Sequence, residues 1–564
     1  MKTILTSFFA KYYLHVLSIA VLFLTIIKTF QQLPLTFYQQ DEWLGLGQIM
    51  AIGWGSISKE NSIIQILFGE GRPLTRVANV LFYEFFGLQS FPLAIYSITF
   101  HFFNTILVYF IINKLIKNKF LALSGALYFA VADVAHQSVT WSGASFGEQP
   151  ASFFIFLSVL VFLFFLEKKR KLFLYLSFIS ALISLYFKES GIFLIPLYLI
   201  LPYIYDRKYS VKKLFISFIP ILLFLFFFAG FRFIEMITSG MTYQTSVYLN
   251  SNSTNTIPVI ILRAFLYPLT SFSLSFIPYP IAISLGEWLW KLYYPYITSR
   301  PDVVFTTVIL DLIAVIISVI FLIFCFFIEK IKELRSSVTF ALIFFFLSIL
   351  PYVTISKTYA YLEPRYYYIS LLANCVLISA SFSFLINIFQ RKWKIAVVII
   401  FIIYGFYLRY NLGLVRNDIS IQVDIGNERK AFINDLYSYL PTLKNDTNIF
   451  YFTGDKTWLV ENNFTPFQNG FGYTLMVLYY PSGKIPKVLL PTHYLFALGE
   501  EGVKTIDGKT FGYFNNYTDL KKYLTENNIP LKSVISFYYN RSNKKLYNIT
   551  DKIQGELAQA NERD

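Results

Sequence analysis

Two adjacent carboxylates follow the first apolar segment of the chain, and their position suits chemistry at a membrane face. Asp41 and Glu42 come shortly after the apolar run 12–30. Carboxylates at such a place are costly unless water or a cation solvates them, and a carboxylate held there can take a proton from an attacking hydroxyl. The same pair also suits the N-terminus of a helix over 43–52, where the helix dipole favours acidic side chains. The residues alone leave both interpretations open.

Three basic residues lie at the ends of other apolar segments. They are Arg72 in Gly-Arg-Pro-Leu, Lys188 in Phe-Lys-Glu-Ser-Gly, and Arg365 in Glu-Pro-Arg-Tyr. Fixed cations bind anionic groups through charge-assisted hydrogen bonds. The alternative is a snorkelling residue at the membrane interface, and Lys188 could also form a neutral pair with Glu189 inside the bundle.

A polar loop over 136–148 begins with His136 and ends with Glu148, with a tryptophan and two glycines between them. Glycine and tryptophan suit the rim of a pocket, although tryptophan is common at membrane interfaces in any case. We therefore treat His136 and Glu148 as candidate pocket residues, together with Glu363 of the Glu-Pro-Arg motif. The spacing does not show the convergent ligands of a metal site, so metal binding stays open.

The composition places these residues in a membrane protein. The chain has 564 residues, of which 56% are hydrophobic and 14% charged, whereas globular chains carry roughly 25% charged residues. The chain has two cysteines, and its apolar residues form long blocks. These features exclude a soluble enzyme, a disulfide scaffold and a disordered chain. The net charge of +15 comes from basic residues at the ends of the apolar blocks, which the positive-inside rule explains without nucleic-acid binding.

Segments of about 16 to 25 apolar residues predict about eleven membrane-spanning helices. The predicted spans are 12–30, 91–113, 120–135, 149–166, 172–187, 190–205, 214–235, 303–328, 338–356, 367–389 and 395–408. Every second loop is strongly basic, which predicts a cytoplasmic N-terminus. The candidate residues then lie in outer segments, namely 31–90, 136–148, 188–189, 236–302 and 357–366.

The outer stretch 236–302 contains an apolar run broken by several prolines. We favour a re-entrant or surface-lying segment over two further spans. The compartment it faces is the outside of a bacterial plasma membrane, although an endoplasmic reticulum location would give the same topology.

Residues 409–564 differ in character, because polar and charged residues are interspersed and nearly balanced in charge. We predict a small extracytoplasmic, soluble α/β domain without a catalytic signature. Its predicted elements are strands at 448–453, 475–480 and 533–539, a helix at 519–526, and a terminal hairpin of 534–539 with 545–549.

The first outer loop resembles that of the GT-C superfamily of membrane glycosyltransferases, especially protein O-mannosyltransferases and lipid A aminoarabinose transferases. The segment Asp41-Glu42-Trp-Leu-Gly-Leu-Gly-Gln-Ile-Met50 is similar to the acidic motif of that loop, and Gly71-Arg72-Pro73-Leu74 to its later basic motif. The likeness continues in pattern through Phe187 to Gly191 and Glu363 to Tyr366, and covers roughly residues 1–405.

This resemblance implies an α-helical polytopic GT-C-like catalytic domain over 1–408, with the first outer loop at 31–90. It implies transfer of a sugar from a polyprenyl-phosphate donor to a glycan, lipid or protein acceptor, with inversion at the anomeric carbon. Asp41 would be the general base and Glu42 the second choice. Arg72, Lys188 and Arg365 would hold the lipid phosphate, and the pocket would include His136, Glu148, Glu189 and Glu363. Some members use a divalent cation and others do not.

Two other function classes remain. A transporter or lipid flippase often shows interrupted spans in corresponding positions of two halves, but no such symmetry is evident, and the ionisable residues gather at span ends. The third class is a non-catalytic polymer-assembly protein whose C-terminal domain binds a glycan or a partner. The sequence names neither the sugar, the acceptor nor the oligomeric state.

Overall fold

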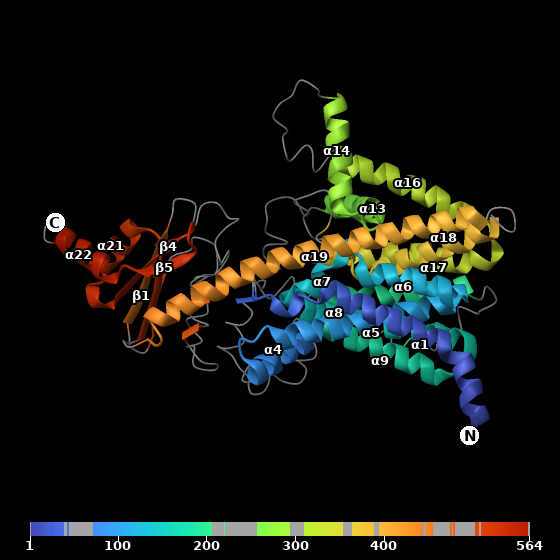
Figure 1. Ribbon diagram of the computed structural model, residues 1–564, viewed down its shortest axis with the longest axis horizontal. Coiled ribbons are helices and arrows are strands. Elements are labelled where there is room, and N and C mark those ends of the chain that lie inside the picture. Colours follow the sequence, from blue (N-terminus) through green and yellow to red (C-terminus); the bar gives the residue numbers. More distant parts are fainter. Residues whose placement is uncertain are drawn as a thin grey trace. The chain divides into compact units, whose positions relative to one another are not determined.

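The computed structural model describes the chain in segments and places it in two compact units (Figure 1). The described residues are 2–38, 42–43, 72–205, 219, 257–293, 309–353, 362, 364–388, 394–443, 447–454, 474–475, 478–479, 502–506 and 509–561. The first unit comprises Met1–Gln31, Ile63–Thr75 and Ala94–Asp418, and the second comprises Gln32–Ser62, Arg76–Leu93 and Ile419–Asp564.

The first unit is a bundle of helices. Its long helices are α1 (Lys2–Phe30), α5 (Phe91–Ile116), α6 (Lys119–Val131), α8 (Ser142–Lys168), α9 (Lys171–Phe187), α10 (Leu194–Tyr205), α16 (Leu310–Glu329), α17 (Lys332–Ile349), α18 (Leu371–Ile388) and the first part of α19 (Lys394–Tyr439). Short helical turns join them, namely η3 (Asp133–Ala135), α7 (Gln137–Thr140), η4 (Glu189–Phe193), η6 (Leu350–Tyr352) and η7 (Pro364–Tyr367).

Seven of the described helices are long and apolar enough to cross a membrane. They are Tyr12–Leu35, Phe91–Ile116, Ser142–Lys168, Leu310–Glu329, Lys332–Tyr352, Leu371–Ile388 and Val397–Tyr439. The chain is therefore an integral membrane protein built mainly of helices, as the apolar blocks predicted.

The predicted count of eleven spans is not confirmed. Three of the predicted spans are shorter apolar helices, Lys119–Val131, Lys171–Phe187 and Glu189–Tyr205. The first has 13 residues, which gives a length of about 20 Å against a hydrocarbon core of about 30 Å. The predicted span 214–235 lies outside the described residues except for residue 219.

The proline-rich stretch contains a sharply bent helix pair, α13 (Ile257–Leu274) and α14 (Tyr279–Tyr293). The two axes differ by 103°, and the break ends at Pro278, where the missing N–H and the ring prevent a continuous helix. The pair forms either one broken span or a re-entrant segment. If it is one span, the described helices include eight candidate spans instead of seven. The Ser273 hydroxyl donates to the Ala314 carbonyl at 2.7 Å and ties α13 to α16.

Small residues bring the bundle helices close together. A Cβ atom on Gly125 of α6 would lie 2.5 Å from the carbonyl oxygen of Cys375 in α18, so only glycine permits this approach. Ser158 of α8 donates to the Ser177 carbonyl of α9 at 2.7 Å. Small and hydroxyl-bearing residues are typical of helix contacts in membranes, where close packing and hydrogen bonds replace the hydrophobic effect.

The second unit contains a five-stranded sheet among its described residues. The strands are β1 (Thr447–Gly454), β2 (Gly502–Ile506), β3 (Lys509–Phe514), β4 (Val534–Asn540) and β5 (Lys545–Asn548), in the order β2-β3-β1-β4-β5. β1 pairs in parallel with β3 and β4, and the two outer pairs are antiparallel.

Most of the predicted C-terminal elements are confirmed. β1 and β4 cover the predicted strands at 448–453 and 533–539, β4 and β5 form the hairpin, and α21 (Tyr517–Glu526) covers the predicted helix. The predicted strand at 475–480 is wrong, because its described residues and Thr474 are helical. Periodicity does not distinguish helix from strand in so short an apolar run.

Both faces of the sheet are apolar because both are covered. Along β1, Ile449 and Tyr451 lie in the core made with α21 and α22 (Thr550–Asn561). Phe452 points to the other face, where its ring stacks on Phe432 of α19 with centroids 6.1 Å apart. Helix α19 continues without a break through the predicted domain boundary at 408/409 as far as Tyr439 (Figure 1).

Candidate functional site

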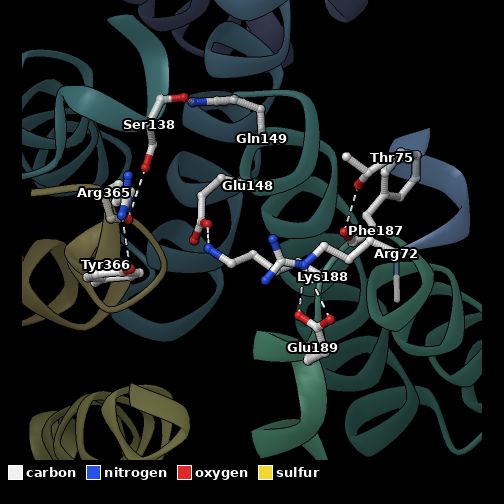
Figure 2. Close-up of polar contacts among 10 residues, drawn as sticks. All are labelled: Arg72, Thr75, Ser138, Glu148, Gln149, Phe187, Lys188, Glu189, Arg365 and Tyr366. Atoms are coloured by element: carbon white, nitrogen blue, oxygen red, sulfur yellow. Dashed lines mark hydrogen bonds and ion pairs between the residues drawn. The ribbon is translucent and has the colours of Figure 1, made fainter. Parts of the chain in front are cut away.

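Three of the predicted cations come together in the first unit. Arg72 precedes the helix α4 (Pro73–Phe86), Lys188 connects α9 to η4, and Arg365 lies in η7. The charges of both arginines act on the Lys188 ammonium, and Figure 2 shows the three side chains with the carboxylates of Glu148 and Glu189. The structure thus gathers residues that are far apart in the sequence, and we call these five residues the cation cluster.

Arg72 is held by a carboxylate. Its Nε lies 2.9 Å from Oε2 and 3.2 Å from Oε1 of Glu189. The Thr75 hydroxyl donates to the Phe187 carbonyl at 2.7 Å, which ties the start of α4 to the end of α9. Arg72 has a φ of 60°, a left-handed conformation that is uncommon outside glycine. Such a conformation persists only where the surroundings fix it, and is frequent at functional sites.

Lys188 forms an ion pair with Glu148 of α8 (Figure 2). The side chains are 12% and 1% exposed, respectively. Burial, and then the positive charges of Arg72 and Arg365, lower the pKa of Lys188 well below its usual range, while Glu189 opposes this shift. A bound anion at this place would relieve the repulsion among the three cations.

Arg365 contacts two aromatic rings. The guanidinium carbon lies 4.4 Å from the centroid of Trp141 and 5.0 Å from that of Tyr366, and Nη2 donates to the Tyr366 hydroxyl at 3.1 Å. The Arg365 carbonyl accepts a hydrogen bond from the Ser138 hydroxyl at 3.0 Å. Cation–π contacts and this backbone bond fix the guanidinium plane.

A buried polar network supports that position from within the bundle. Gln149, fully buried, donates to the Ser138 carbonyl at 2.9 Å. Its Oε1 accepts from Asn104 Nδ2 and from the Tyr368 hydroxyl, each at 3.0 Å, and Tyr368 also bonds to His101 Nδ1 at 2.8 Å. Buried hydrogen-bond networks of this kind rigidify a core, although Asn104 Oδ1 has no hydrogen-bond partner among the described residues. The sequence analysis did not single out Tyr368 and His101, because no sequence spacing relates them to the candidate motifs.

The predicted pocket residue His136 has a different set of partners. Its Nε2 lies 2.9 Å from Oδ2 of Asp418 in α19, and its Nδ1 lies 3.7 Å from Oδ1 of Asp133. Burial disfavours the imidazolium, but the hydrogen bond to Asp418 and the charges of both aspartates raise the pKa of His136 to about 9. The charged histidine therefore joins η3 to α19. Sequence reasoning missed both aspartates, although Asp133 lies at the i−3 position.

The acidic motif is described only in part. Asp41 and Glu363 lie outside the described residues. Glu42 belongs to the second unit and is 7% exposed, so the interpretation of a water-facing carboxylate fails for Glu42. The charge of Glu42 acts on Arg429 of α19, whose Nη1 donates to the Tyr38 carbonyl at 3.2 Å.

The rest of this segment is also fixed to α19 within the second unit. Trp43 is 1% exposed, and its ring centroid lies 5.5 Å from that of Tyr38. Lys430 donates to the Leu35 carbonyl at 3.2 Å. A Cβ on Gly426 would lie 3.0 Å from the backbone nitrogen of Phe37, so the chain before the acidic motif follows this helix closely.

The charges of the cluster favour an anionic ligand. The ion pair with the buried Glu148 carboxylate favours the charged form of Lys188, and with Lys188 protonated the three cations and two carboxylates leave a formal charge of +1. Within the described segments, no group of three or more His, Cys, Asp or Glu residues is placed to hold a metal ion. The arrangement can therefore bind a phosphate-like group through its own side chains.

Comparisons with known proteins give likenesses to solved structures but none to a family model or a curated protein. No family model matches the sequence, and no curated protein matches it. The chain is similar to a solved structure of the archaeal oligosaccharyltransferase AglB from Archaeoglobus fulgidus, in complex with an inhibitory peptide and a dolichol-phosphate, with 12% identity and a TM-score of 0.44. The match covers 84% of this chain and 64% of that chain, so this chain spans less than two thirds of that protein.

Proposed function

We propose that the protein is a membrane glycosyltransferase that transfers a sugar from a polyprenyl-phosphate donor to an acceptor at the outer face of the membrane. The observation that supports this most is the meeting of Arg72, Lys188 and Arg365 in one cluster. A lipid phosphate gains negative charge as the bond to the sugar breaks, and preorganised cations stabilise that charge. The GT-C-like first outer loop supplies the second line of support.

The charge balance of the cluster fits this reaction. A polyprenyl-phosphate sugar is a phosphodiester with one negative charge, which would neutralise the +1 of the cluster. The acceptor oxygen forms a bond to the anomeric carbon, and the bond from that carbon to the phosphate oxygen breaks with its electron pair. The product is a phosphate monoester with a charge of about −1.5 to −2 at neutral pH, so the cations interact more strongly with the product than with the donor.

We assign the acceptor's proton to Asp41. A single displacement of this kind inverts the anomeric configuration, and the hydroxyl proton passes to a carboxylate. Glu42 is less suited, because it is buried and its charge acts on Arg429. We propose that Glu42 and Arg429 hold the segment that carries Asp41, and that the acceptor is a glycan, a lipid or a protein. Glu363 stays a proposed pocket residue, and the divalent cation stays open.

The experiment measures the transfer of a radiolabelled sugar from its polyprenyl-phosphate donor to a product. Membranes that contain the wild-type chain are incubated with radiolabelled polyprenyl-phosphate sugars and cell extract, which supplies acceptors. We expect transfer into a water-soluble, protein-bound or new lipid-linked product, and loss of transfer in Asp41→Asn and Arg365→Ala. Lys171→Gln is the matched control, because Lys171 begins the helix that ends just before Lys188. Undiminished transfer in a folded Arg365→Ala variant would refute the role of the cluster. Movement of an unchanged lipid across the membrane without transfer would favour a flippase.

A further inference from the structure

Two buried hydroxyls beside Lys188 have no hydrogen-bond partner among the described residues except each other. Tyr352, at the end of η6, and Ser190, in η4, are each 4% exposed. The two hydroxyls interact with each other, but among the residues that the structure describes neither makes a hydrogen bond to any other group, so at least one O–H donor of the pair stays unused. A buried polar group without a partner is destabilising, so each such group in a folded protein calls for a ligand or another explanation.

Both hydroxyls belong to the surroundings of the cation cluster. The Tyr352 ring centroid lies 5.8 Å from Lys188 Nζ and 4.8 Å from the ring centroid of Tyr366. The charges of Arg72 and Glu189 also act on the Tyr352 hydroxyl. Ser190 follows Lys188 by two residues on the same turn. The two hydroxyls are therefore next to the place where a phosphate would bind.

The indole of Trp141 adds an unpaired donor. Its Nε1 is buried and makes no hydrogen bond to the described part of the chain, while its ring supports Arg365 at 4.4 Å. On the acceptor side, the carboxylate oxygens of Glu148 form the ion pair with Lys188 but make no further hydrogen bond among the described residues. The cluster thus offers uncharged donors, a buried acceptor and aromatic rings together.

This combination fits a neutral, hydroxyl-rich group better than a second phosphate. The three cations already supply the charge that a phosphate needs, whereas hydroxyl and indole donors add directional bonds without charge. Sugar hydroxyls both donate and accept hydrogen bonds, and aromatic rings supply rigid apolar surface. In a polyprenyl-phosphate sugar, the anomeric carbon is bonded to a phosphate oxygen. A sugar must therefore lie directly beside the cations that hold its phosphate.

We infer that Tyr352, Ser190 and Trp141 form the subsite that binds the sugar of the donor. The inference rests on the proposed function and extends it, because it separates recognition of the sugar from recognition of the phosphate. Arg72, Lys188 and Arg365 bind the phosphate of any polyprenyl phosphate. The three uncharged donors distinguish the glycosylated lipid from the bare one.

The test compares two ligands in one protein. The full chain in lipid nanodiscs is titrated with a bare polyprenyl phosphate and with its mannosyl and glucosyl forms. In the wild type, at least one glycosylated lipid binds more tightly than the bare lipid. Tyr352→Phe and Ser190→Ala each weaken binding of that glycosylated lipid about 3- to 10-fold, because each removes one hydrogen bond. Neither variant changes binding of the bare lipid by more than about 2-fold. Tyr175→Phe is the matched control, because Tyr175 is a half-exposed tyrosine near the start of α9.

The outcomes separate the inference from the proposed function. Wild-type protein that binds neither kind of lipid refutes the proposed function itself. If the wild type binds all the lipids equally, the sugar subsite is overturned while the phosphate site stands. The same conclusion follows if the variants lose binding of the glycosylated and the bare lipid equally, or lose binding of neither. If Tyr352→Phe lowers the thermal midpoint of the protein, Trp141→Phe repeats the test, since it keeps a ring under Arg365 and removes the indole N–H.

Discussion

Lys188 and Glu148 form an ion pair in which the carboxylate is almost completely buried, with 12% and 1% of the two side chains exposed. Two charges removed from water repay their desolvation only while both are present. We propose that the pair has two roles that mutations can separate, one in the stability of the bundle and one in holding Lys188 toward an anionic ligand.

The first prediction concerns stability. Lys188→Met leaves the Glu148 carboxylate buried without its partner, and we expect the free energy of unfolding to fall by about 3 kcal/mol. The double variant Lys188→Met with Glu148→Met replaces both charges by apolar groups, and should recover most of that loss. Urea or thermal unfolding in detergent measures the difference, and neither variant should bind a polyprenyl phosphate. Additive losses in the double variant would show that the two residues do not depend on each other.

The second prediction concerns the stacked guanidinium of Arg365. Its contacts with Trp141 and Tyr366 need a planar cation, which an ammonium does not supply. We expect Arg365→Lys to reduce kcat/KM for the lipid donor about tenfold, and Arg365→Ala to reduce it further. Arg335→Lys is the control. Arg335 lies exposed on α17, and its hydrogen bond among the described residues is the one that it donates to the Glu329 carbonyl. Equal activity of Arg365→Lys and wild type would exclude a role for the stacking.

The third prediction concerns pH. The pKa of His136 is raised to about 9, above the value of about 6.5 expected in the unfolded chain. The charged histidine thus stabilises the fold fully below about pH 6.5, and this contribution disappears as the pH rises through about 9. Since Asp418 is partly exposed, we expect a loss of about 2 kcal/mol. The thermal midpoint of the wild type should fall across this window more steeply than that of His136→Gln. Parallel curves would show that His136 does not contribute.

The sequence predicted the cation cluster better than it predicted the rest of the site. Arg72, Lys188 and Arg365 were found because each cation stands at the end of an apolar segment, where position is strongly constrained. The partners of His136 could not be found in this way, since Asp418 is more than two hundred residues away and lies in a helix read as the start of another domain.

The errors in the fold have related causes. Hydropathy detects apolar segments but not their length as helices, so the three short helices leave the predicted count of eleven spans unconfirmed. The described residues of the predicted strand at 475–480, which include Leu475 and Tyr479, are helical, and the Tyr479 ring stacks on Phe450 with centroids 5.9 Å apart. Aromatic residues suit both a strand and a helix that covers a sheet, so their burial alone did not decide between them.

The last prediction concerns the side of the membrane on which the sheet lies. Cys325 and Cys375 are both buried, so the wild-type chain should not react with a membrane-impermeant maleimide. Single exposed cysteines can therefore be introduced while both native cysteines are kept. The basic loops predict that Lys171, at the start of α9, faces the cytoplasm, and together with the predicted count of eleven spans they predict that Lys522, on α21, faces outward. In intact cells we expect Lys522→Cys to be labelled and Lys171→Cys to be labelled only after permeabilisation. The reverse pattern would put the sheet in the cytoplasm. Because α9 runs from Lys171 to Phe187 and ends beside Lys188, labelling of Lys171→Cys in intact cells would also contradict the orientation that the basic loops predict for the segment before the cation cluster.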